Sequence, residues 1–261
     1  MRIDIWSDIA CPWCYIGKRR LETALADFEH GEEVEVVWHS FELDPGAPVP
    51  PTETSASALT RKYGHDGQVE AMMKQVAEVA AGEGLDYRLA DTLHLNTRDG
   101  HRLLHLALDT GGPALQGTLK EALLEAYFVR AQDVTDHAVL REIAVGAGLD
   151  GARVDEVLAG DEFSAAVDRD IEGARAYGAG GVPFVVVGGR YGVSGAQPAD
   201  VFLGAIRQAW ALQHPQLEHI GDTAGAAAAG GAGGAAAGGA GGAAAVAVAE
   251  GAVCGPDGCT D

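Results

Sequence analysis

The four cysteines of this chain are its most distinctive chemical groups, and they form two close pairs. Cys11 and Cys14 lie near the N-terminus with two residues between them, and Cys254 and Cys259 lie at the other end of the chain. A small secreted protein held together by disulfides has many cysteines in a short chain, whereas this chain has 261 residues. The two pairs therefore indicate thiol redox chemistry or metal binding.

The surroundings of the first pair favour redox chemistry. Ile3 and Ile5 alternate with polar residues and predict a short strand, and apolar residues at helical spacing follow Cys14. Cys11 is thus expected at a helix N-terminus, where unpaired N–H groups lower the pKa of a thiol. Pro12 suits the first helical turn, and Cys14 lies one turn further on the same face. We predict that Cys11 is the attacking thiolate and Cys14 the resolving thiol.

A zinc site is the main alternative at this point, because a Cys-x-x-Cys pair is also half of a structural zinc knuckle. Such a site needs a second pair of ligands in a comparable knuckle nearby. The only other cysteines of the chain lie about 240 residues away. We therefore rank redox chemistry above zinc and expect no bound metal.

The pattern along the chain predicts strand, helix, strand, a helical block, strand, strand and helix. Apolar residues recur at helical spacing throughout residues 52–177, which predicts an inserted helical segment. Asp136 and Asp150 stand at expected helix starts. The other elements are predicted at residues 2–7, 15–28, 34–41, 182–187, 191–194 and 199–212.

Charge and composition exclude several classes of partner. The chain has 18 Lys and Arg against 38 Asp and Glu, a formal net charge of −20, which repels nucleic acid and anionic membrane surfaces. The first residues contain no apolar stretch of the kind found in secretory signals. We therefore expect a cytoplasmic protein with neither nucleic-acid nor membrane partners.

The last segment, residues 221–261, is a low-complexity tail. From Ala224 to Val253 it contains 16 Ala and 10 Gly with Glu250 as the one charged residue. The run is long enough to suggest a transmembrane helix, but its many glycines weaken a helix by about 1 kcal/mol each. We expect a flexible linker instead.

The second cysteine pair hangs on this linker. Cys254 and Cys259 bracket a Gly-Pro-Asp-Gly sequence, which favours a turn that brings them close together. A flexible tether of about 30 residues reaches roughly 30 Å, enough to bring the pair to Cys11. One hypothesis is therefore a redox relay between the two pairs. The alternative is that the tail pair has no role, and the sequence favours neither.

Several further motifs complete a family resemblance. They are Ser7 to Arg20, which contains both cysteines of the first pair, and then Trp38 to Leu43, Asn96-Thr97 with His101 to His105, Gly181 to Val185, and Val193 to Pro198. With these motifs in this order over residues 2 to about 212, the chain resembles the DsbA-type thioredoxin-fold oxidoreductases. It is most similar to their cytoplasmic FrnE-like branch.

The resemblance implies an α/β architecture. Residues 1–50 and 178–215 would form a discontinuous thioredoxin-like core, residues 52–177 an inserted all-helical domain, and residues 221–261 a flexible Ala/Gly-rich tail. It also implies that Val182 and a cis Pro183 face the cysteines and serve as a backbone platform for an extended substrate.

The resemblance also implies a substrate class. We expect protein or small-molecule disulfides and thiols as substrates, turned over by oxidation, reduction or isomerisation without a bound cofactor. Glutathione is a candidate redox partner. Pro12 and an exposed, apolar Trp13 would contact the substrate. Because the dipeptide between the cysteines lacks the histidine found in DsbA, we expect a less oxidising dithiol than that of DsbA.

Two other functions remain open. The 2-hydroxychromene-2-carboxylate isomerases and the kappa-class glutathione transferases have a similar architecture, but they generally carry a serine at the nucleophile position and use glutathione. A zinc-binding or peptide-binding module without turnover is the third possibility. Two cysteines in the motif favour the oxidoreductase.

The polar residues around the motif are expected to have structural roles. Lys18, Arg19 and Arg20 are predicted on a solvated helix face, and His101 and His105 in packing or in a cleft. For Asp8 a turn or capping role is at least as well supported as proton transfer.

Overall fold

The computed structural model describes residues 1–64, 67–215, 253–255 and 258–260. Its centre is a four-stranded mixed sheet with the strand order β2-β1-β3-β4. β1 pairs in parallel with β2 and antiparallel with β3, which in turn pairs antiparallel with β4. The strands are β1 (Arg2–Ser7), β2 (Glu35–Ser40), β3 (Phe184–Val187) and β4 (Tyr191–Ser194). All four strands lie within the segments that the sequence predicted as strands.

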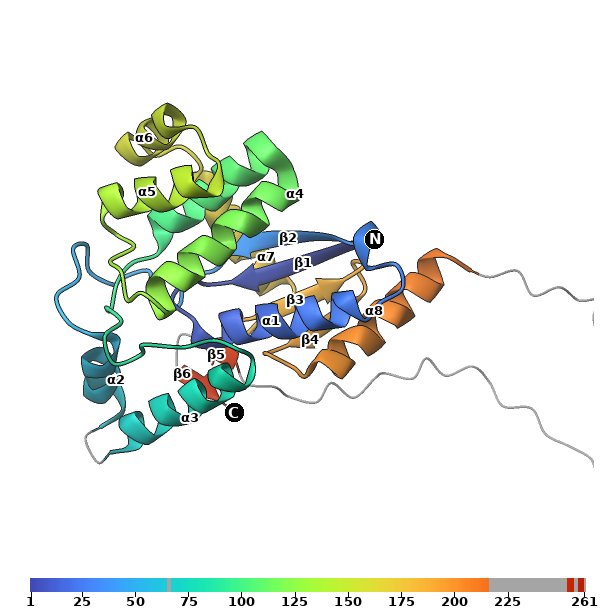
Figure 1. Ribbon diagram of the computed structural model, residues 1–261, viewed down its shortest axis with the longest axis horizontal. Coiled ribbons are helices and arrows are strands. Elements are labelled where there is room, and N and C mark those ends of the chain that lie inside the picture. The colour runs from blue at the N-terminus through green and yellow to red at the C-terminus, as the bar shows by residue number, and fades with distance from the viewer. Residues whose placement is uncertain (65–66, 216–252, 256–257, 261) are drawn as a thin grey trace, which may run out of the picture.

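Two helices cover one face of this sheet and lie side by side (Figure 1). They are α1 (Pro12–Ala26) and α8 (Ala199–Gln213). Ile3 and Ile5 of β1 join Phe202 and Ile206 of α8 in one buried cluster, whereas Trp6 belongs to the cluster on the other side. The alternation that predicted a strand thus divides β1 between two cores.

The predicted helical insertion between β2 and β3 is confirmed. A short 3-10 helix, η1 (Gly31–Glu33), precedes β2, and six α-helices follow it. Asp136 and Asp150 cap the starts of α5 and α6 with their side chains, as predicted. The inserted helices are α2 (Ser55–Tyr63), α3 (Gln68–Gly82), α4 (Arg98–Phe128), α5 (His137–Ala147), α6 (Gly151–Ala159) and α7 (Ser164–Ala176).

The longest inserted helix, α4, is kinked. Gly112 adopts a positive φ of 68° directly before Pro113, a backbone conformation that glycine adopts without steric cost. The first half of α4 carries His101 and His105, and the second half contacts β2 through Gln116 and α1 through Glu121. The kink lets one helix contribute side chains to two parts of the sheet.

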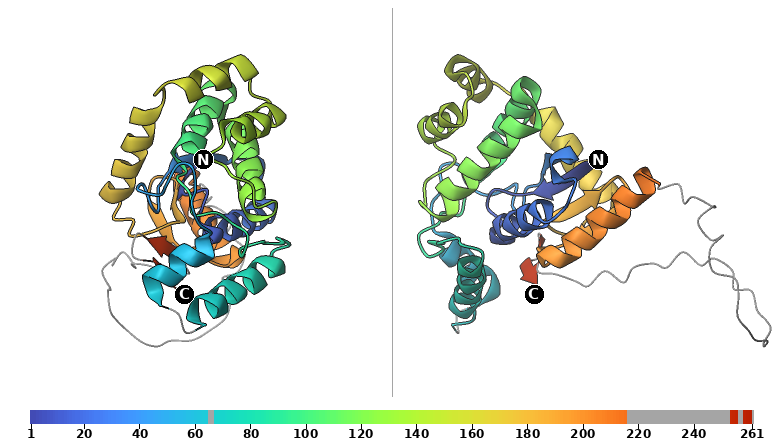
Figure 2. Two further views of the ribbon diagram at one scale, coloured as in Figure 1. Left: turned by 90° about the vertical axis from the view of Figure 1, so that its left-hand side faces the viewer. Right: turned by 45° about the vertical axis from the view of Figure 1, so that its right-hand side comes forward.

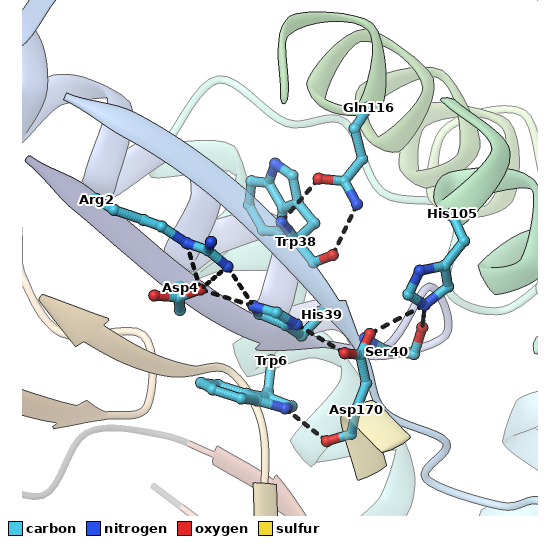
Figure 3. A network of polar contacts seen from close by, with 9 residues as sticks. All are labelled: Arg2, Asp4, Trp6, Trp38, His39, Ser40, His105, Gln116 and Asp170. Atoms are coloured by element: carbon cyan, nitrogen blue, oxygen red, sulfur yellow. Dashed lines mark hydrogen bonds and ion pairs between the residues drawn. The ribbon is translucent and has the colours of Figure 1, made fainter. Parts of the chain in front are cut away.

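Polar contacts join the insertion to the sheet (Figure 3). The side-chain amide of Gln116 accepts from the Trp38 backbone N–H at 2.9 Å and donates to the Trp38 carbonyl at 2.8 Å. On the other side of β2, the Trp6 indole donates to the Asp170 carbonyl at 2.7 Å. These bonds fix α4 against the edge strand β2 and α7 against its neighbour β1.

The end of the chain contains a two-stranded hairpin, β5 (Val253–Gly255) and β6 (Gly258–Thr260). The stretch proposed as a linker, residues 224–253, lies almost wholly outside the described residues. Within the described part of the chain, no helix is long and apolar enough to cross a membrane.

Candidate active site

Cys11 and Cys14 lie where β1 leads into α1, as predicted. Cys11 is the N-cap of α1 with extended backbone (φ −92°, ψ 114°), and Pro12 is the first helical residue. The Cys14 N–H donates to the Cys11 carbonyl at 3.0 Å, which closes the first turn. Both cysteines are free thiols, 0% and 1% exposed. The motif is therefore a buried dithiol at a helix N-terminus.

Val182 and Pro183 face this dithiol. The peptide bond between them is cis, as the resemblance implied, and the Cys11 Sγ donates to the Val182 carbonyl at 3.5 Å. Gly17 of α1 packs against the proline ring so closely that a Cβ there would lie 3.1 Å from the Pro183 Cγ. The structure thus brings together the four residues predicted to form the reaction centre and its platform.

Each of the two buried thiols affects the pKa of the other. Burial alone would raise the pKa of Cys14, but a hydrogen bond with Cys11 and the positive charge of Lys120 lower it below its ordinary value. Burial, the neighbouring Cys14 and the charge of Asp8 raise the pKa of Cys11 well above its ordinary value. Burial affects both thiols alike, and the role of Cys11 as the attacking thiolate stays a prediction.

Asp8 holds the loop that leads into Cys11. Its carboxylate accepts from the Leu43 N–H at 2.7 Å and from the Ala10 N–H at 3.3 Å, and it lies 3.3 Å from the His101 Nε2. Burial would raise the pKa of Asp8, but the hydrogen bond with His101 and the backbone donors lower it. A buried carboxylate with these partners supports the turn-holding interpretation. Its charge also disfavours a thiolate on Cys11.

Lys120 of α4 is the residue of this site that sequence reasoning missed. Its side chain is 0% exposed, and its Nζ has no hydrogen-bond partner among the described residues. The Nζ lies 5.7 Å from the centre of the Trp38 ring. Lys120 lies on the buried stripe of α4, which also contains Leu119, Leu123 and Leu124. A lysine within an apolar stripe was therefore a signal that the sequence offered.

A cavity of about 460 Å³ opens beside the motif. It lies between the α2–α3 pair and the loop before α1, and Ala10 and Pro12 form part of its wall. Met72, Met73 and Val76 of α3 make the opposite wall largely apolar. The volume is within the range of small-molecule sites. Pro12, predicted to contact the substrate, is thus half-buried at the edge of a cavity.

Two expectations about the surroundings of the motif are wrong. Trp13 was expected on the surface but is 4% exposed, because the first turn of α1 packs into the core shared with the inserted helices. Lys18, Arg19 and Arg20 do not form a solvated face. Lys18 and Arg19 pair with Glu121 of α4, and Arg20 pairs with Glu83 at the end of α3. These cations attach α1 to the insertion.

The histidines near the motif pack in different ways. His101 is fully buried against Asp8, whereas His105 lies 3.0 Å from Asp170 and 3.2 Å from the Ser40 hydroxyl. Both sites agree with the predicted packing role. Among the described residues, no cluster of three His, Cys, Asp or Glu side chains is arranged to hold a metal ion.

The second cysteine pair lies in the terminal hairpin. Cys254 and Cys259 are directly opposite each other in the β5–β6 register. Figures 1 and 2 show this hairpin at the end of the sheet where α1 begins. This backbone pairing confirms the predicted closeness of Cys254 and Cys259. Their participation in the catalytic cycle stays a prediction.

Comparisons with known proteins agree with this geometry. The sequence profile of the family described as a DSBA-like thioredoxin domain matches residues 2–207. A solved structure of a probable DsbA oxidoreductase from Streptomyces coelicolor is 42% identical, with a TM-score of 0.77. The alignment covers 100% of this chain and 99% of that one.

Two more distant structures share the fold. The 2-hydroxychromene-2-carboxylate isomerase is 14% identical with a TM-score of 0.60, covering 82% of this chain and 98% of that one. The cytosolic disulfide reductase DsbM from Pseudomonas aeruginosa, solved with GSH, is 16% identical with a TM-score of 0.52, covering 82% and 97%. At these identities the likeness concerns the fold alone.

Proposed function

This chain belongs to the DsbA-like thioredoxin domain family, and on that premise we propose that it is a thiol-disulfide oxidoreductase that works through Cys11 and Cys14. The observation that carries the proposal is the reduced dithiol at the start of α1, with the Cys11 Sγ bonded to the Val182 carbonyl beside cis Pro183. This arrangement presents a reactive sulfur next to a backbone edge. An extended peptide or a small disulfide can pair with such an edge.

The chemistry is two successive thiol-disulfide exchanges. Cys11 loses its proton, and its thiolate attacks one sulfur of the substrate disulfide. The other substrate sulfur leaves as a thiolate and takes up a proton. Cys14 then loses its proton and attacks the Cys11 sulfur, which releases the second substrate thiol and leaves a Cys11–Cys14 disulfide. The substrate gains two electrons, and the protein loses two.

The disulfide that remains must be reduced again for another turnover. We propose glutathione as the redox partner, because two molecules of this small thiol can supply the two electrons in the reverse exchanges. The cavity beside Pro12 offers room for a small molecule next to the motif. A cytoplasmic location would supply glutathione in its reduced form.

The direction of catalysis depends on the stability of the dithiol. DsbA, with a potential of about −120 mV, is a strong oxidant because its reduced form is stabilised. Here Pro12-Trp13 supplies no histidine between the cysteines, so we expect a more negative potential. Equilibration with glutathione buffers measures it, and a potential as high as that of DsbA would contradict the expectation.

The test of the function is a trapping experiment. A Cys14→Ser variant is expected to accumulate a mixed disulfide on Cys11 when mixed with hydroxyethyl disulfide or oxidised insulin, because the resolving thiol is missing. The matched Cys11→Ser variant is expected to form none. Mass spectrometry identifies the adduct, and glutathione-coupled turnover of the unmodified protein gives the rate. Absence of both the adduct and turnover would refute the proposal.

An alternative function belongs to the 2-hydroxychromene-2-carboxylate isomerase type. The fold likeness and the apolar cavity beside Pro12 are the observations in its favour. It predicts glutathione-dependent isomerisation of a chromene carboxylate that survives replacement of Cys14. A binding module without turnover is the other alternative. It predicts stoichiometric zinc or peptide in the purified protein and no exchange chemistry.

For the tail we propose a redox relay, in which Cys254 and Cys259 exchange with the Cys11–Cys14 disulfide. The opposed register of the two residues and the location of the hairpin at the end of the sheet where α1 begins support it (Figure 2). Deleting residues 222–261 should slow reduction of the active-site disulfide. A double Cys254→Ser, Cys259→Ser variant keeps the tail and controls for its bulk. An unchanged rate in both would remove the relay.

A further inference from the structure

We infer that Arg20 is a positioning residue that holds the Val182-Pro183 segment against the dithiol, and that the exchange with extended peptide substrates depends on it. The inference rests on the proposed oxidoreductase function, which it deepens by assigning the residue that joins the two sides of the reaction centre. The sequence predicted Arg20 on a solvated helix face, but its side chain is 20% exposed.

The contacts of Arg20 differ from those of its two cationic neighbours. Lys18 and Arg19 donate to side chains of α1 and α4. The Arg20 Nε donates to the Glu83 Oε1 at 2.6 Å, and the Nη1 of the same guanidinium donates to the Ala196 carbonyl at 2.6 Å. A planar guanidinium fixes two acceptors in a defined geometry. Arg20 therefore joins the end of α3 to the turn between β4 and α8.

This turn in turn holds the segment that faces the dithiol. The Gly195 N–H donates to the Pro183 carbonyl at 2.8 Å. The carbonyl of the preceding residue, Val182, accepts from the Cys11 Sγ at 3.5 Å. Two successive hydrogen bonds, one from Arg20 to the turn and one from the turn to the segment, thus lead from α1 to the backbone beside the reactive sulfur.

One face of α1 carries both the dithiol and Arg20. Cys14, Gly17 and Arg20 follow one another at intervals of three residues, which places them along one side of the helix. A Cβ at Gly17 would lie 3.1 Å from the Pro183 Cγ and 3.5 Å from the Ala196 Cα. The helix backbone therefore lies directly against the segment and the turn. This contact begins at the dithiol and ends at Arg20, whose bond to the Ala196 carbonyl closes it.

Loss of that bond should affect extended substrates more than small ones. A peptide that pairs with the backbone of the Val182-Pro183 segment needs this edge at a fixed distance from the Cys11 sulfur. A small disulfide needs only access to the sulfur. If Arg20 had a structural role alone, its loss would lower stability and would change the rates of both kinds of substrate alike.

The test uses the full chain with Cys14→Ser, Cys254→Ser and Cys259→Ser, in which Cys11 is the remaining thiol. Two probes carry the same leaving group, nitrothiobenzoate, in a disulfide with either a short linear peptide or mercaptoethanol. The Cys11 thiolate attacks the sulfur of the peptide or of mercaptoethanol and forms a mixed disulfide. The bond to nitrothiobenzoate breaks, and the leaving group departs as a coloured thiolate that is followed by its absorbance.

The expected result is a difference between the two probes. In an Arg20→Met variant of this parent, the second-order rate constant should fall at least tenfold for the peptide probe and less than threefold for the mercaptoethanol probe. Arg19→Met is the matched control, because it removes an arginine of α1 that is 28% exposed and pairs with Glu121 of the insertion. It should stay within twofold of the parent for both probes. Equal slowing of both probes by Arg20→Met would overturn the inference.

Two further variants avoid the risk that Arg20→Met does not fold. Glu83→Gln removes the ion pair but leaves the bond from Arg20 to the Ala196 carbonyl, so it should stay within threefold of the parent for the peptide probe. Arg20→Lys keeps the positive charge but lacks the planar fork that reaches both acceptors, so it should behave like Arg20→Met. Peptide rates that are equal in Glu83→Gln and Arg20→Lys would contradict the role of the Ala196 bond.

Amide exchange tests the positioning without a substrate. In Arg20→Lys, the Gly195 N–H should exchange with deuterium at least tenfold faster than in the parent, because its hydrogen bond to Pro183 opens more often. The amides of β1 should exchange at the rates of the parent. An unchanged rate at Gly195 overturns the inference. A parent that reacts with neither probe would refute the proposed function, and the exchange at Gly195 would still decide whether Arg20 holds the segment.

Discussion

His39 offers a quantitative test of how the insertion is held on the sheet. Its Nδ1 lies 2.8 Å from the Asp170 Oδ1 of α7, and its Nε2 lies 2.8 Å from the Asp4 Oδ1 of β1 (Figure 3). Burial alone would lower the pKa of His39, but the hydrogen bonds and charges of the two aspartates raise it to about 9. A charged imidazole on β2 thus joins β1 to α7.

The size and sign of its contribution follow from that pKa. Relative to the ordinary value of 6.5, a pKa of about 9 corresponds to about 3 kcal/mol of stability at most. The unfolded chain loses the imidazole proton near pH 6.5, whereas the folded chain keeps it to about pH 9. The contribution is therefore fully present below pH 6.5, declines between these values and is absent above about pH 9.

The perturbation is His39→Gln, which keeps a hydrogen-bonding side chain but cannot carry a charge. Urea unfolding at pH 6, 7.5 and 9.5 should show the variant about 2 to 3 kcal/mol less stable at pH 6. The difference should fall to under about 1 kcal/mol at pH 9.5, because groups such as Lys120 titrate in both proteins and cancel. A difference that stays constant with pH would refute the electrostatic reasoning. It would assign the role of His39 to its stacking on Trp6 at 4.6 Å.

Three further outcomes are expected. In urea unfolding, Gly17→Ala should have a free energy of unfolding about 1 to 2 kcal/mol lower than the matched Gly204→Ala, because a Cβ at Gly17 meets Pro183 whereas Gly204 has open space. Gly17→Ala should also react more slowly with glutathione disulfide. Arg102→Met should lower the free energy of unfolding by about 3 kcal/mol, because the buried Arg102 side chain donates to three backbone carbonyls in and just after α6. Thermal unfolding measures this loss. Raising salt from 0.05 to 0.5 M should change the thiolate absorbance of the active-site pair less than twofold, since both cysteines and the nearby charges of Asp8 and Lys120 are buried.

The parts of the site that the sequence predicted are those carried by local pattern. Cys11 and Pro12 reveal the helix start, because capping and the constraints of proline act within one turn. Pro183 follows from its place at the start of a strand together with the family resemblance. The kink in α4 was not predicted, although Gly111-Gly112-Pro113 is a sequence typical of a break in a helix.

The parts that the sequence did not predict depend on contacts between distant segments. Trp13 is buried because inserted helices pack over it, and no local signal distinguishes such a residue from an exposed one. Arg19 finds its partner Glu121 across 102 residues, and His39 finds Asp170 across 131. Charged residues at a predicted helix surface read as solvated until the facing element is known.

The net charge of −20 would suggest that any thiolate in this protein is strongly disfavoured. That conclusion does not follow, because exposed carboxylates beyond a screening length of about 8 to 10 Å have little effect at ordinary salt. A buried charge acts through a medium of low polarisability and is screened far less. Asp8 and Lys120 are both buried, and they act on the dithiol in opposite directions: Asp8 raises the pKa of Cys11, and Lys120 lowers the pKa of Cys14. Because Lys120 belongs to the insertion, the inserted helices help to set the chemistry of the core.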